Sequence, residues 1–152
     1  MKNFLRLFAF ALSFTFVFTS CKKEEGDGLG RTTKAGLLTG KAWAVTAQTE
    51  TDSTGKTVDI FKDYAFCEKD NYLKLEKNGV AYFYEGDSIC ADTPAITEAT
   101  WGFTDNETKL DLATEDAYLP SDIVSLDENQ MILKNTIDKI TIQTTFTIKE
   151  VK

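Results

Sequence analysis

The sequence predicts an all-β domain, an antiparallel up-and-down barrel of about eight strands, with a two-layer sandwich as the alternative. Only two of the 152 residues are proline, and many are Thr, Val, Ile, Tyr or Phe, which favour strands. Short segments of alternating apolar and polar residues recur between turn-forming residues. Asn78-Gly79, a strong hairpin signal, lies midway between Cys67 and Cys90. A meander of this kind removes its exposed edges by closing into a barrel.

Residues 1–20 have the layout of a secretory signal, with Lys2 and Arg6 as a short basic start and a run from Leu5 to Phe18 that is apolar apart from Arg6, Ser13 and Thr15. That run has 14 residues. As a helix rising ~1.5 Å per residue, it would be about 21 Å long. A bilayer core is about 30 Å thick. We therefore expect a segment that is removed, not a permanent transmembrane helix.

The segment Phe18-Thr19-Ser20-Cys21 resembles the lipobox of bacterial lipoproteins. The resemblance implies cleavage before Cys21, attachment of acyl chains such as palmitate to it, and anchoring in the outer membrane of a Gram-negative bacterium. Three cysteines leave an odd one in a secreted chain, which lipidation of Cys21 would explain. The alternative is an ordinary signal peptide with an incidental cysteine.

Residues 21–36 are rich in glycine and charge, which predicts a flexible tether between the lipidated cysteine and a single domain over residues 37–152. Glu24 and Glu25 also resemble the surface-export signals of some Gram-negative lipoproteins, with a plain solvated tether as the alternative. The domain would face either the periplasm or the cell surface.

The charge and the missing histidines exclude several functions. Removing residues 1–20 takes away two of the 17 basic residues and none of the 24 acidic ones, so the net charge becomes −9. Nucleic-acid binding needs basic patches and is not expected. Without histidine, Ser-His-Asp and Cys-His catalysis and histidine metal sites are excluded. Adjacent acids such as Glu115-Asp116 and Asp127-Glu128 are typical of solvated turns. We expect a monomer that is not an enzyme, with no metal and no cofactor.

The hairpin around Asn78-Gly79 has two possible registers. A two-residue turn would pair Leu73 with Tyr84, whereas a three-residue loop with Gly79 in the left-handed region would pair Leu73 with Phe83. The second register is favoured, because it gathers Leu73, Leu75, Ala81 and Phe83 on one face. Either register allows a disulfide between Cys67 and Cys90, which implies an oxidising compartment.

The remaining segments are assigned from their alternation. A helical turn is expected at 37–40, and strands at 41–50, 57–60, 97–104, 108–113, 123–126, 130–135 and 139–149. Residues expected to share an inward face are Trp43, Val45 and Ala47; Ala99, Trp101 and Phe103; Leu110 and Leu112; Met131 and Leu133; and Ile140, Ile142, Thr144, Phe146 and Ile148.

Residues 37–43, Leu-Leu-Thr-Gly-Lys-Ala-Trp, resemble the first strand of lipocalins, although the spacing here is Gly-x-x-Trp and not Gly-x-Trp. The strand segment Thr100-Trp101-Gly102-Phe103 and the meander resemble them as well. The likeness is strongest to the lipocalin-like domains of bacterial lipoproteins and extends over residues 37–151. It implies a barrel that binds a small apolar molecule in its cup.

Eight side chains are candidates to line the interior: Trp43, Leu73, Leu75, Phe83, Trp101, Phe103, Ile142 and Phe146. They would either surround a ligand or form a packed core. A carrier of a small apolar ligand is therefore one functional hypothesis. The other is an envelope interaction module, a class that includes inhibitors, that binds protein or glycan through its loops or through Tyr72, Tyr82 and Tyr84. A void of about 300 Å³ or more would favour the carrier.

Overall fold

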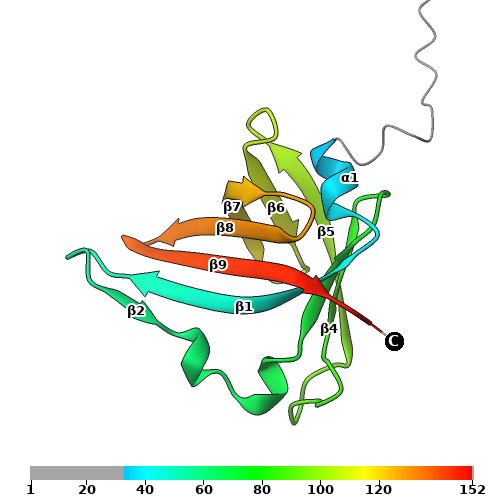
Figure 1. The fold of residues 1–152 in the computed structure, drawn as a ribbon, viewed down its shortest axis with the longest axis horizontal. Coiled ribbons are helices and arrows are strands. Elements are labelled where there is room, and N and C mark those ends of the chain that lie inside the picture. The colour runs from blue at the N-terminus through cyan, green and yellow to red at the C-terminus, as the bar shows by residue number, and fades with distance from the viewer. Residues whose placement is uncertain (1–32, 152) are drawn as a thin grey trace, which may run out of the picture.

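The computed structural model describes residues 33–151 (Figure 1). The signal segment 1–20, Cys21 and most of the expected tether lie outside the described residues. The elements are one short helix, nine strands and two 3-10 turns: α1(Lys34–Leu38), β1(Ala42–Thr51), β2(Thr57–Asp59), η1(Phe61–Asp63), η2(Phe66–Glu68), β3(Tyr72–Leu75), β4(Val80–Tyr84), β5(Ile96–Thr104), β6(Lys109–Ala113), β7(Tyr118–Leu126), β8(Gln130–Ile137) and β9(Ile140–Lys149).

Eight of the strands close into an antiparallel barrel. From β3 to β9 each strand pairs with the next one along the chain, and β1 pairs with both β3 and β9. The remaining strand, β2, pairs only with the far end of β1, at Thr49–Thr51. The expected up-and-down barrel is therefore confirmed, and the sandwich alternative is wrong.

One end of the barrel, called here the closed end, is covered by α1, which lies on the side opposite the turns η1 and η2 (Figure 1). Thr33 caps the helix, since its hydroxyl accepts a hydrogen bond from the Gly36 backbone N–H at 3.0 Å. The indole N–H of Trp43 donates to the carbonyl of Leu38 at 2.9 Å, and both side chains are fully buried. The helix begins at Lys34, earlier than the expected turn at 37–40, so it includes residues assigned to the tether.

The hairpin has the favoured register. Leu73 pairs with Phe83 and Leu75 with Ala81, and Gly79 has a φ of +85°. Leu73, Leu75 and Ala81 are buried, but Phe83 is 36% exposed because it lies toward the other end of the barrel. On the outer face, the Tyr72 and Tyr84 rings stack with centroids 4.7 Å apart.

The hydrophobic core fills the closed half of the barrel with Leu38 of α1, Trp43 of β1 and inward residues of β3, β4, β5, β6 and β8. The residues of β6 and β8 that were expected to face inward are all buried: Leu110, Leu112, Met131 and Leu133. Trp101 and Phe103 are partly buried and pack against this core. Ile140 and Ile148 are 39% and 40% exposed, because they lie at the two ends of β9.

The expectation for β1 is wrong beyond Val45. The pairing of β1 with β9 shifts by one residue between Val45 and Ala47, so Thr46 forms a β-bulge. A bulge adds one residue to one strand and exchanges its faces from that point on. Ala47 is therefore exposed, and Gln48 takes the inward position opposite Thr144.

The other end, called here the open end, is formed by the loops at residues 52–71, 85–95 and 114–117 and the turn between β8 and β9. The disulfide between Cys67 and Cys90 joins the first two loops, with Cα atoms 5.3 Å apart, and confirms the predicted pairing. Gly86 packs against Asp70, and a Cβ atom at residue 86 would lie 2.3 Å from the Asp70 Cγ atom.

None of the helices within residues 33–151 has the length and hydropathy to cross a bilayer.

Candidate functional site: a cavity at the open end of the barrel

A cavity of about 240 Å³ lies inside the barrel, between the packed core and the open end. Its floor is apolar and is made by Trp43 from β1, Leu73 from β3, Leu112 from β6 and Leu133 from β8. All four of these side chains are at most 7% exposed. The floor of the cavity is therefore the upper surface of the hydrophobic core.

Apolar side chains also surround the upper part of the cavity. Val45 and Phe146 face each other across the β1–β9 pairing. Phe83 and Leu119 line the cavity while remaining 36% and 38% exposed, which places them where the cavity meets solvent. An apolar molecule of matching size would remove this surface from water, at about 25 cal/mol for each Å² buried.

One wall of the cavity is polar because of the bulge in β1. The Gln48 side-chain amide donates to the Thr144 hydroxyl at 2.8 Å, and its Oε1 accepts from the Tyr64 hydroxyl at 2.6 Å. Burial raises the pKa of Tyr64 above its ordinary value, the charge of Glu68 raises it further, and the hydrogen bond to Gln48 lowers it. These contacts fix the Gln48 side chain against the wall.

Two further neutral polar residues of the lining, Ser121 of β7 and Asn135 of β8, extend this wall. Ser121 is 3% exposed, and it pairs with Leu110 on the inward face of its strand. A ligand in the cavity would therefore meet hydroxyl and amide groups on this side and hydrocarbon below.

The rim carries Glu85, which is the single carboxylate in the cavity lining as far as the described part of the chain forms it. Its Oε1 accepts from the Asn71 side-chain amide at 3.0 Å, and its Oε2 accepts from the Cys90 backbone N–H at 3.2 Å. Asn71 in turn accepts from the Gly86 backbone N–H at 3.1 Å. The disulfide loops are therefore held together by the same group that places a negative charge at the rim.

The structure brings four of the eight candidate interior residues to this cavity: Trp43, Leu73, Phe83 and Phe146. The other four do not border it. Leu75 points inward, but deeper, in the packed closed half, and Trp101 and Phe103 pack against each other with ring centroids 5.6 Å apart. Ile142 lies opposite Glu50 and Asn135 near the far end of β9. For Leu75, Trp101 and Phe103, the packed-core interpretation fits.

Among the polar residues of the cavity, Thr144 was expected to face inward, but Gln48, Ser121 and Glu85 are absent from the sequence-based prediction. Gln48 was not expected to face inward, because the alternation of apolar and polar residues does not reveal the bulge at Thr46. Ser121 was missed because it precedes the segment expected as a strand. Glu85 follows a predicted strand and lies between the two cysteines, so the hairpin placed it near the disulfide without indicating its role.

The arrangement offers groups that can bind a small molecule. Across residues 33–151, no three His, Cys, Asp or Glu side chains come together in a way that could hold a metal ion. The cavity lining offers hydrocarbon, neutral hydrogen-bonding groups and one fixed carboxylate.

Comparison with known proteins gives a family and a structural likeness. Residues 38–133 match the family model described as a lipocalin-like domain. Among solved structures, the chain is similar to a lipocalin-like protein from Bacteroides uniformis, with a TM-score of 0.47 and 7% sequence identity. That alignment covers 73% of this chain and 97% of the other. A search of curated proteins gave no match.

Proposed function

The chain belongs to the lipocalin-like domain family, and we propose that it is a lipid-anchored protein of the cell envelope that binds a small, largely apolar ligand inside the barrel. The observation that supports ligand binding is the cavity of about 240 Å³ above the core, apolar at its floor and open to solvent at its rim. A cavity of about 150 Å³ lined by Leu, Ile and Phe binds benzene in another protein. Pockets for drug-sized ligands usually have about 300–1,000 Å³. The volume here lies below that range and does not reach the void of about 300 Å³ set above for a carrier, so the proposed ligand is smaller than a typical drug.

The proposed anchor is Cys21, at the end of the segment that resembles a lipobox. The described chain enters the fold at Thr33 and α1, at the closed end. An anchor before this point would hold the closed end toward the bilayer and leave the cavity accessible from the side away from the membrane. We propose the outer membrane of a Gram-negative bacterium as the location, with a monomeric domain facing the periplasm or the cell surface.

The ligand is best sought by native mass spectrometry of the protein with its own signal segment and Cys21, purified gently from the envelope of its own host. A discrete small-molecule mass that is lost on denaturation would support the carrier function. Thr97 lines the cavity, whereas Thr100 on the same strand is exposed. Thr97→Phe should abolish the adduct, and Thr100→Phe should retain it. A bare mass for the wild-type chain would contradict the proposal.

The anchor needs a separate test, because the cavity could function without it. Cys21→Ser should move the protein from the membrane fraction to the soluble fraction after cell lysis. If the variant stays with the membranes, Cys21 is not the anchor.

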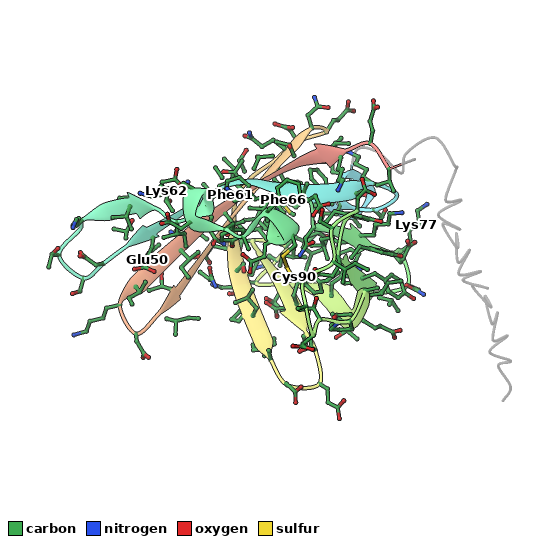
Figure 2. All side chains as sticks on the ribbon, turned by 90° about the horizontal axis from the view of Figure 1, so that it is seen from below. Glu50, Phe61, Lys62, Phe66, Lys77 and Cys90 are labelled. Carbon is green, nitrogen blue, oxygen red and sulfur yellow. A yellow bond between two sulfur atoms is a disulfide. The ribbon has the colours of Figure 1, made fainter. Side chains whose placement is uncertain are left out.

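The second candidate, an envelope interaction module, is favoured by one observation. Phe66 is 83% exposed and Ile89 is 59% exposed, and each is the residue before a disulfide-bonded cysteine. Figure 2 shows Phe66 and Cys90 close together beside the loops of the open end. If native mass spectrometry finds the protein without any bound molecule, Phe66 and Ile89 become the next feature to test. The binding of candidate protein and glycan partners would then be compared between the wild type and Phe66→Ser.

A further inference from the structure

We propose that the cavity selects a cationic amphiphile, a small molecule with an apolar part and a protonated amine or ammonium head, and that the head pairs with Glu85. This inference rests on the proposed ligand-binding function and names the class of ligand. The apolar part would occupy the floor above Trp43 and Leu133, and the charged head would lie at the rim.

The first argument is the position and fixation of the Glu85 side chain. Its two oxygens accept hydrogen bonds from Asn71 and Cys90 at 3.0 and 3.2 Å, and Cys90 is tied to Cys67 by the disulfide. An ionised carboxylate has about four acceptor sites. The two protein donors hold the group in place and leave acceptor capacity for the donors of a ligand. A preorganised carboxylate forms stronger hydrogen bonds with a cation than with a neutral donor.

The second argument is the absence of any positive charge in the lining. Within residues 33–151, none of the residues that line the cavity is lysine or arginine. A carboxylate head, such as that of a fatty acid, would lose water at the rim without gaining an ionic partner, and it would lie near Glu85. Burying an unpaired charge is costly, and like charges repel. The neutral groups Gln48, Thr144 and Ser121 can orient a head group, but they cannot neutralise an anion.

The third argument is the distribution of charge between the two ends of the barrel. The segments at the open end, residues 50–72, 85–95, 113–118 and 136–141, contain 12 acidic residues and four lysines, a net charge of −8. The segments at the closed end, residues 33–43, 74–80, 103–110, 126–131 and 148–151, contain six of each. A cleft surrounded by one sign of charge attracts oppositely charged ligands and repels like ones. The negative field is thus concentrated at the end where the cavity opens.

The test uses three ligands of equal chain length that differ in the charge of the head: octylamine, 1-octanol and octanoic acid. Each is titrated by calorimetry at pH 7 into the chain from residue 22, which keeps the whole core and the disulfide of residues 33–151. Octylamine should bind about tenfold or more tightly than octanoate, with octanol between them. The octylamine affinity should fall with added salt, because salt screens charges at an exposed rim. Octanoate binding as tightly as octylamine would overturn the inference.

A matched pair of variants separates direct pairing from the general field. Glu85→Gln should weaken octylamine by about fivefold or more and should weaken octanol less. An unchanged circular-dichroism spectrum checks that the barrel is still folded. Glu115→Gln changes the same charge at the open end in a residue that does not line the cavity, and it should alter octylamine affinity by less than about twofold. Equal effects of the two variants, or an octylamine affinity independent of salt, would contradict pairing with Glu85. If none of the three ligands binds and no natural adduct is found, the proposed carrier function fails, and this inference fails with it.

Discussion

The two ends of the barrel differ in what fills them. At the closed end, large side chains such as Leu38, Trp43, Leu75 and Leu110 have no exposed surface. At the open end the interior is bordered by a cavity, polar side chains and partly exposed apolar residues such as Phe83 and Leu119. In Figure 2, Lys77 of the closed-end hairpin and Glu50 lie on opposite sides of the molecule, with Phe61, Phe66 and Cys90 between them. The difference suggests that the closed end supplies stability and the open end supplies selectivity.

The largest effect is expected at the centre of the closed end. Trp43→Ala removes a fully buried indole and its hydrogen bond to Leu38, which should lower the free energy of unfolding by about 3–5 kcal/mol. The control is Trp101→Ala, because Trp101 also donates to a backbone carbonyl, that of Glu76 at 2.8 Å, but is only partly buried. Urea unfolding should show a clearly smaller loss for Trp101→Ala. Equal losses would mean that the closed end is not the more important source of stability.

The disulfide should contribute the next largest amount, and its effect should be local to the open end. Replacing both Cys67 and Cys90 with serine should cost about 3 kcal/mol, since the bridge restricts the unfolded chain. Hydrogen exchange should increase in residues 61–71 and 85–95, while the amides of β6 and β8 change only with global stability. A uniform increase throughout the barrel would contradict a separate role for the open end.

A smaller effect is expected from the close contact between two open-end loops. Gly86→Ala places a Cβ atom 2.3 Å from the Asp70 Cγ atom, so one loop must shift, at a cost of about 1–3 kcal/mol. Gly102→Ala is the matched control, because a Cβ atom there meets nothing within 4 Å. Thermal unfolding should show a lower Tm for Gly86→Ala and no loss for Gly102→Ala. A neutral Gly86→Ala would mean that these loops adjust freely.

The smallest effect concerns alkaline pH. Burial raises the pKa of Tyr64 above its ordinary value of 10.0, so the fold favours the protonated phenol. The resulting stabilisation is complete below pH 10.0 and is lost as pH rises from there through the folded-state pKa. Tyr64→Phe should lose about 1 kcal/mol at pH 7 with its hydrogen bond to Gln48, and its stability should decline less between pH 9 and 12. If the stability of Tyr64→Phe declines as steeply between pH 9 and 12 as that of the wild type, the alkaline loss of stability comes from other tyrosines.

The closed end was largely predictable from the sequence, and the open end was not. Alternation identified Leu73, Leu75, Leu110, Leu112, Met131 and Leu133 because the closed half buries one face of every strand. Gly79 determined the hairpin register, because the favoured three-residue loop needs a left-handed residue at that point. The two cysteines placed symmetrically about that turn then indicated the disulfide.

The features of the open end depend on how side chains fit together in three dimensions. The alternation of apolar and polar residues along a strand does not predict that fit. Trp43 and Leu75 alternate in the same way, yet one borders the cavity and the other lies in the packed core. Whether inward side chains meet or leave a void depends on how far opposite strands diverge. The role of Glu85 depends on Asn71 and Cys90 reaching it from 14 residues before and five residues after it in the chain.

The bulge at Thr46 has a consequence for how this cavity can change over evolution. One surplus residue in β1 turns Ala47 outward and Gln48 inward, and so produces the polar wall. Deleting Thr46 would leave Ala47 outward and Gln48 inward, because both would keep their partners on β9. Straightening the bulge with every residue kept would instead bring Ala47 and Thr49 inside and move Gln48 and Glu50 outside. The polarity of the chamber is therefore encoded in how β1 pairs with β9 as well as in its side chains. Loss of the bulge without loss of a residue would replace the whole inward set of this strand in a single step, in a way that no single substitution in the lining could reproduce.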